Sequence, residues 1–140
     1  MPASLTLHAT SIAVEGRAAL IRGASGSGKS GLALQLMALG AGLVSDDRTV
    51  VWRDGDLLIA DAPAPIRGQI EARGVGILNA PAMGPAQVVL LIDLDAEPGA
   101  RLPVPVSEDV LGLPIQRVSR NDAPHFPAAI HLLLRCGRAF

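Results

Sequence analysis

The sequence predicts an α/β protein with a mixed central sheet and flanking helices. Residues 23–30, Gly-Ala-Ser-Gly-Ser-Gly-Lys-Ser, match the phosphate-loop (Walker A) pattern G-x-x-x-x-G-K-[ST] at every position. A short apolar run, 18–21, predicts a strand before this loop, and the helix-forming residues 31–39 predict a helix after it. The continuous apolar run 88–93 indicates a second buried strand.

The composition of the loop suits phosphate binding. Its glycines permit a tight turn and a close approach of the backbone, and the N-terminus of the following helix favours an anion. The expected phosphate-binding residues are Gly23, Ala24, Ser25, Gly26, Ser27, Gly28, Lys29 and Ser30. Lys29 is expected to reach the β- and γ-phosphates of a bound nucleotide, and the Ser30 hydroxyl to ligate Mg²⁺. A glycine-rich turn without a ligand is the alternative, but the flanking strand and helix argue against it.

Length and composition limit the class of protein. The chain has 140 residues and no linker or repeat, so residues 1–140 are expected to form a single domain. Hydrophobic residues make up 49% and charged residues 18%, which excludes a disordered or fibrous chain. A net charge of −1 and an aromatic content of 2% disfavour a nucleic-acid partner, because neither a broad basic surface nor a stacking platform is available.

The sequence also predicts a cytoplasmic protein without a membrane partner. No apolar run approaches the roughly 20 residues that a membrane-spanning helix requires. The first residues lack the pattern of a secretory signal. Cys136 is the only cysteine, which excludes an internal disulfide and fits a reducing compartment.

Further strands are expected on both sides of the loop. Two short runs, 5–8 and 11–14, suit strands. Residues 43–45 predict a short strand after the helix. The runs 49–53 and 57–60 flank Asp54-Gly55, which is a strong signal for a hairpin.

The second half of the chain carries weaker signals. A short helix is expected at about 66–72, and a loop with three prolines at 96–105. Residues 106–119 are expected to hold one or two short strands. The run Asp122-Ala123-Pro124 predicts a helix start, with the helix continuing from 125 to 135.

Asp46 and Asp47 end the predicted strand 43–45. In a doubly wound sheet this strand can lie beside the phosphate-loop strand, so that both carboxyl ends open on one crevice. A carboxylate there can hold Mg²⁺ through water or accept a proton from an attacking hydroxyl. Adjacent strand residues point to opposite faces, which indicates different roles for the two acids. A solvated turn is the alternative.

The stretch 71–79 is the second unusual segment. Glu71 could add a carboxylate to a metal site, and Arg73 could bind phosphate or hold the loop. Gly74 and Gly76 suggest a backbone that is shaped for close approach. On the pattern alone, a structural loop with a salt bridge explains these residues equally well. His8, a lone histidine before the loop, is by itself more typical of a packed or surface residue.

Taken together, these blocks resemble the catalytic domain of bacterial HPr kinase/phosphorylase. The resemblance covers roughly residues 5–95 and is carried by His8, the phosphate loop, Asp46-Asp47 and the block 71–79. It implies a phosphate-loop kinase fold related to phosphoenolpyruvate carboxykinase, and a homo-oligomer, a hexamer in known members. The implied activity transfers the γ-phosphoryl group of ATP to a serine of HPr, the phosphocarrier protein of the sugar phosphotransferase system. Many members also run the reverse phosphorolysis.

The same resemblance assigns roles to individual residues. Lys29 would bind phosphate, and Ser30 and Glu71 would bind Mg²⁺, with Asp46 as the neighbouring acid. Asp47 would be the base that activates the substrate serine. His8 matches the active-site histidine of the family.

Several departures from the family pattern limit these expectations. Arg101, followed by Leu102, is the best match for the catalytic arginine, although Ala100 replaces the expected acid. The segment linked to phosphorolysis is reduced to 119–121, so kinase activity is expected more than phosphorylase activity. The chain starts directly at the catalytic domain, as in short, single-domain members.

A small-molecule kinase and a non-catalytic ATP sensor remain alternatives. No aromatic residue of the sequence is well placed to hold the adenine base, so we expect no aromatic contact with it.

Overall fold

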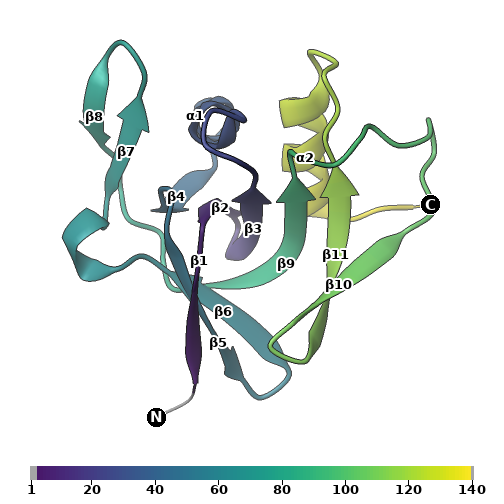
Figure 1. Cartoon of the computed structure of the whole chain (residues 1–140), viewed down its shortest axis with the longest axis horizontal. Coiled ribbons are helices and arrows are strands. Elements are labelled where there is room, and N and C mark those ends of the chain that lie inside the picture. Colours follow the sequence, from purple (N-terminus) through teal and green to yellow (C-terminus); the bar gives the residue numbers. More distant parts are fainter. Residues whose placement is uncertain (1–2, 140) are drawn as a thin grey trace.

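A computed structural model describes residues 3–139, which form a nine-stranded mixed sheet, a separate two-stranded hairpin and two α-helices (Figure 1). The predicted α/β class with a mixed sheet is confirmed. Within the described residues, neither helix has the length and apolar character needed to cross a bilayer. The elements are β1 Ser4–Leu7, β2 Ala9–Val14, β3 Arg17–Arg22, α1 Lys29–Ala38, β4 Gly42–Ser45, β5 Thr49–Asp54, β6 Leu57–Asp61, the 3₁₀ turn η1 Ala64–Ile66, β7 Gln69–Ala72, β8 Gly76–Asn79, β9 Ala86–Asp93, β10 Val106–Val110, β11 Leu113–Ser119 and α2 Phe126–Cys136.

The topology of the sheet brings four carboxyl ends to one edge. The strand order is β1-β5-β6-β9-β3-β2-β4, and β11 joins β9 and β10. β9 runs parallel to β3 and β11, while β2 is antiparallel to both β3 and β4. Strands β3, β4, β9 and β11 therefore point the same way, and the segments that follow them meet.

β9 is the bent centre of the sheet (Figure 1). Its first residues, Ala86 and Gln87, pair with β6, whereas residues 90–93 pair with β11. The two helices pack against each other and against β2 and β3. Because the strands alternate, β2 and β3 give Ile12, Val14, Ala19 and Ile21 to the helix-covered core, and Ala13, Ala18 and Leu20 to a second core enclosed by the curled sheet itself.

Three local expectations from the sequence are wrong. The strand 43–45, observed as β4, does not lie beside the phosphate-loop strand β3, because β2 occupies the place between them. Residues 66–72 do not form a helix: η1 ends at Ile66, and β7 pairs with β8 in a hairpin. The helix α2 begins at Phe126 with His125 as its N-cap and Pro127 in its first turn, so Asp122 is not the cap.

An ion-pair network fixes the end of the phosphate-loop strand. Arg22 donates to both carboxylate oxygens of Glu108 and, at 2.8 Å, to Asp93. The hydrogen bond from Arg22 lowers the pKa of Glu108, and Arg117 adds to this effect. Burial alone would raise the pKa of Asp93, but the hydrogen bonds from Arg22 and the backbone of Asp95 outweigh it and lower the pKa. The network ties β3, β9 and β10 together beside the loop.

The buried face of α1 should dominate the stability of the helix-covered core. Leu36 is 0% exposed, whereas Leu39, one turn later, is 48% exposed. Leu36→Ala is expected to lower the free energy of unfolding by about 2–5 kcal/mol, since it leaves a cavity in the core. Leu39→Ala should change it by less than about 0.5 kcal/mol. Urea denaturation of both variants checks the pair, and equal effects would contradict the packing of α1.

The Arg22 network predicts a loss of stability in acid. Folding lowers the pKa of Asp93 and Glu108 below their ordinary values of 3.8 and 4.5, so their stabilising effect is fully present above those values and is lost as the pH falls from there through the lowered pKa of the folded state. Urea denaturation between about pH 6 and pH 3 should show this decline, and Glu108→Gln should flatten it. Glu97→Gln, at an exposed position in the following loop, is the matched control. A pH slope that Glu108→Gln leaves unchanged would argue against the network.

Candidate active site

Residues 23–28 form the loop between β3 and α1 that the motif predicts. Gly23 is required by close packing, because a Cβ at this position would lie 2.4 Å from the Ser27 hydroxyl oxygen. Gly28 has a φ of 101°, a left-handed conformation that glycine adopts without strain. No side chain caps the N-terminus of α1. Its first-turn N–H groups are therefore free of a competing cap and favour an anion.

Lys29 lies inside the loop that it follows. The residue is 7% exposed, and Nζ donates to the backbone oxygens of Gly23 at 2.8 Å and Ala24 at 3.3 Å. These bonds keep a buried positive charge at the edge of the loop. The Lys29 side chain would need only a change of conformation for its ammonium group to reach a phosphate held by the loop.

Asp46 is the centre of the hydrogen bonds around the loop. Its Oδ1 accepts from the Ser30 hydroxyl at 2.7 Å and from the Thr10 hydroxyl at 3.1 Å. Its Oδ2 accepts from the backbone N–H of Glu71 at 2.9 Å. One carboxylate therefore connects α1, β2 and β7, and it brings three predicted site residues together.

Asp47 projects away from this cluster in a strained conformation. Its φ is 64°, which is uncommon for a residue other than glycine and is typically found at functional sites. Its backbone N–H donates to the Thr10 hydroxyl at 3.0 Å, and its Oδ1 lies 2.6 Å from Nε2 of His8. The side chains of His8 and Asp47 are 54% and 56% exposed. A bulky partner could therefore reach this pair.

Two residues of the site were missed by the sequence analysis. Thr10 is 0% exposed and hydrogen bonds to both neighbouring acids, but its role depends on β2 lying next to β4, which no local pattern indicates. Asp95 accepts from the backbone N–H of Ala24 at 3.0 and 3.2 Å. Its position shortly after a buried strand was a usable signal, because the carboxyl ends of parallel strands share one edge.

Other predicted residues are not brought into this cluster. Arg101 is exposed in the loop after β9, and within the described residues it makes no hydrogen bond or ion pair. Arg73 and Gly74 lie in the exposed turn of the β7–β8 hairpin, and Gly76 is the exposed first residue of β8. Glu71 joins through its backbone N–H, whereas its side chain is exposed. Their expected roles stay predictions.

The oxygen atoms of Ser30 and Asp46 fit a magnesium ion that keeps most of its waters. Mg²⁺ prefers hard oxygen ligands and in nucleotide sites uses one or two protein groups together with phosphate oxygens. The hydroxyl and the carboxylate lie 2.7 Å apart at the start of α1. Between residues 3 and 139, no three His, Cys, Asp or Glu side chains form a metal cluster, so a dedicated all-protein cage is not part of this arrangement.

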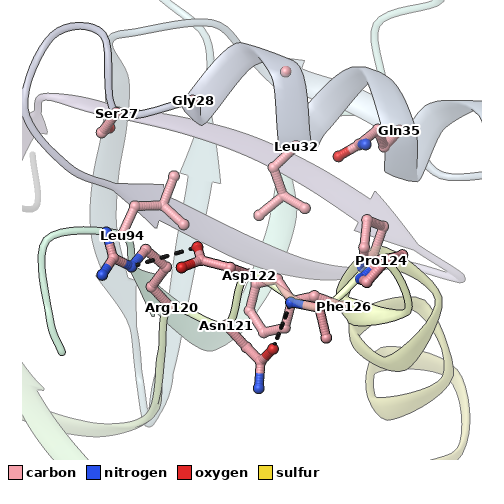
Figure 2. Close-up of a pocket in the computed structure, with 13 residues that line it drawn as sticks. Ser27, Gly28, Leu32, Gln35, Leu94, Arg120, Asn121, Asp122, Pro124 and Phe126 are labelled. Carbon is pink, nitrogen blue, oxygen red and sulfur yellow. Dashed lines mark hydrogen bonds and ion pairs between the residues drawn. The ribbon is translucent and has the colours of Figure 1, made fainter. Parts of the chain in front are cut away.

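The loop stands between two cavities. One, of about 450 Å³, lies between α1 and the segment that joins β11 to α2, and includes Gly28, Leu32 and Phe126 (Figure 2). The other, of about 460 Å³, includes His8 and Ala24 and extends toward β1 and β10. A molecule bound at the loop therefore has space on two different sides.

Comparison with known proteins identifies the family. The family described as HPr Serine kinase C-terminal domain matches residues 1–90, which is more than half of the chain. The HPr kinase/phosphorylase of Burkholderia lata is 36% identical over 81% of this chain and 39% of its own length. The protein of that name from an Exiguobacterium species is 42% identical over 52% of this chain and 24% of its own length.

A solved structure agrees with these sequences. The Hpr(Ser) kinase/phosphatase from Coxiella burnetii has a TM-score of 0.81 and 26% identity to this chain, and the match covers 94% of each chain. The chain spans about two fifths or less of the two curated relatives described above. The predicted resemblance is confirmed. This chain belongs to the HPr Serine kinase C-terminal domain family.

Proposed function

We propose that this chain is a protein-serine kinase that transfers the γ-phosphoryl group of ATP to a serine of the phosphocarrier protein HPr. The observation that carries the proposal is the position of Asp47, which lies hydrogen bonded to His8 beside a complete phosphate loop. The names of the relatives, HPr kinase/phosphorylase and Hpr(Ser) kinase/phosphatase, support the choice of substrate.

The donor half of the reaction rests on the loop and α1. The N–H groups of Ala24 and Ser27 already donate, to Asp95 and to the backbone oxygen of Ala24. The other backbone N–H groups of the loop and the uncapped start of α1 would surround the β-phosphate. Lys29 would exchange its bonds to Gly23 and Ala24 for phosphate oxygens, which places its charge where negative charge builds up. Ser30 and Asp46 would hold Mg²⁺, which when bound neutralises charge on the phosphates.

The acceptor half rests on Asp47. Its carboxylate would accept the proton of the substrate serine as the hydroxyl oxygen attacks the γ-phosphorus and the bond to the leaving ADP oxygen breaks. His8, 2.6 Å from Asp47, would orient this carboxylate. The exposure of both side chains favours a serine on the surface of a protein, because a small molecule would gain little from an open site.

The remaining roles belong to the proposal as well. Arg101 would stabilise the transferring group after the loop around it moves inward, and the side chain of Glu71 would join the metal site. Arg73, with Gly74 and Gly76, would help to shape the edge of the site. A homo-oligomer, a hexamer by family resemblance, is expected, and light scattering would test it. Reverse phosphorolysis is a secondary expectation.

Two substitutions separate binding from transfer. Asp47→Asn should leave ATP affinity within about threefold but lower phosphoryl transfer by about 10²–10⁴-fold, since it removes the proposed base. Lys29→Ala should weaken both ATP binding and transfer. Mass spectrometry of HPr from the same cell, incubated with the protein and Mg²⁺-ATP, would detect the phosphoserine. Transfer that survives Asp47→Asn would refute its role, and ATP binding by the wild type without any transfer would favour an ATP sensor.

Thr10 should act as a positioning residue for both acids. Thr10→Val keeps the shape of the side chain but removes the hydrogen bonds to Asp46 and Asp47. We expect kcat for HPr phosphorylation to fall about tenfold while KM for ATP changes little, and Thr10→Ser to restore most of the rate. An equal loss in both variants would show that packing, and not the hydroxyl, matters at this position.

A further inference from the structure

The structure assigns Asp95 as a positioning residue of the phosphate loop, which it holds by the first peptide unit of the loop. This inference rests on the proposed function and adds a residue that sets the loop for phosphate before a nucleotide arrives. The two carboxylate oxygens of Asp95 accept from the N–H of Ala24 at 3.0 and 3.2 Å. The bond joins the loop after β3 to the segment after β9.

The peptide unit between Gly23 and Ala24 is held from both ends. Its carbonyl oxygen accepts from Nζ of Lys29 at 2.8 Å, and its N–H donates to Asp95. A cation at the oxygen and an anion at the N–H polarise a peptide in the same direction, so each bond strengthens the other. Lys29 and Asp95 therefore act together on one peptide unit.

The backbone around Asp95 is fixed to the end of β3. The N–H of Asp95 donates to Oδ1 of Asp93 at 2.9 Å, and Oδ2 of Asp93 accepts from Arg22 at 2.8 Å. The N–H of Leu94 donates to the backbone oxygen of Arg22 at 2.8 Å. The ion-pair network of Arg22 thus continues through Asp95 to Ala24, and it presents the carboxylate from a fixed backbone.

The anchored peptide determines how the rest of the loop is presented. The N–H of Ser27 donates back to the backbone oxygen of Ala24 at 3.0 Å, so the turn of the loop closes on the residue that Asp95 holds. A loop that is already ordered binds its ligand without the entropic cost of ordering. Loss of the anchor should therefore weaken phosphate binding, although the N–H of Ala24 points to Asp95 and contributes no phosphate contact.

The charge of Asp95 acts in the opposite direction to its hydrogen bond. Asp95 is exposed and lines the same cavity as His8. A carboxylate at this position repels phosphates, which lowers their affinity. Asparagine and leucine separate the two effects, because both remove the charge and keep a similar shape. Asparagine alone retains an oxygen that can accept from Ala24.

Inorganic tripolyphosphate with Mg²⁺ is the probe, because it carries phosphates alone. In isothermal titration calorimetry of the full chain, Asp95→Asn should bind it at least as tightly as the wild type. Asp95→Leu should bind it about tenfold more weakly than Asp95→Asn, since the N–H of Ala24 loses its partner. Asp95→Ala, which removes the acceptor without adding apolar bulk, should match Asp95→Leu. Asp109, another exposed carboxylate that lines this cavity, is the control: Asp109→Asn and Asp109→Leu should bind equally.

The amide proton of Ala24 gives a spectroscopic readout of the same bond. A charge-assisted hydrogen bond is short and strong, which moves the NMR signal of the donated proton downfield. The signal should move upfield in Asp95→Leu. It should also move upfield in Lys29→Ala, which leaves Asp95 in place but removes the cation at the other end of the peptide. A signal that ignores Lys29→Ala would contradict the coupling through this peptide.

The outcomes separate this inference from the proposed function. If Asp95→Asn and Asp95→Leu bind tripolyphosphate equally, the anchor has no role, although the phosphate loop still functions and the proposed kinase stands. A difference of the same size between the two Asp109 variants also overturns the inference, because the effect then belongs to the cavity and not to Ala24. If neither the wild type nor any variant binds tripolyphosphate or ATP, the proposed kinase function fails together with it.

Discussion

The carboxylate of Asp46 is the interaction on which the site depends. It accepts hydrogen bonds from the Ser30 hydroxyl, the Thr10 hydroxyl and the backbone of Glu71, and these groups come from three different elements. Without it, the start of α1, the strand β2 and the β7 hairpin would have no common contact at the mouth of the loop. The same carboxylate thus both assembles the site and supplies a ligand that suits Mg²⁺.

The arrangement of the sheet explains why the neighbouring acids differ. β4 ends at Ser45, and the chain then turns through Asp46 toward the loop and through Asp47 toward His8. Thr10 of β2 contacts both acids because β2 lies directly beside β4.

Much of this arrangement could be predicted from the sequence, because the signals are local. The phosphate loop, its flanking strand and helix, and the Asp54-Gly55 hairpin all follow from short patterns. The position of β2 between β3 and β4 could not be predicted, since strand order depends on long-range pairing. The contacts of Asp95 with Ala24 and of Arg22 with Glu108 join residues far apart in the chain. The place of Asp95 after a buried strand indicates the edge of the sheet on which it lies, but no spacing rule reveals its partner or that of Arg22.

The left-handed backbone of Asp47 sets stability against the role proposed for its carboxylate. A non-glycine residue at φ 64° is destabilising by about 1–3 kcal/mol, and glycine at this position would remove that strain together with the carboxylate. Stability alone would therefore favour glycine here, whereas the proposed function requires the carboxylate. Under the proposed function, a chain with glycine at this position would keep the nucleotide loop and lack the base for transfer.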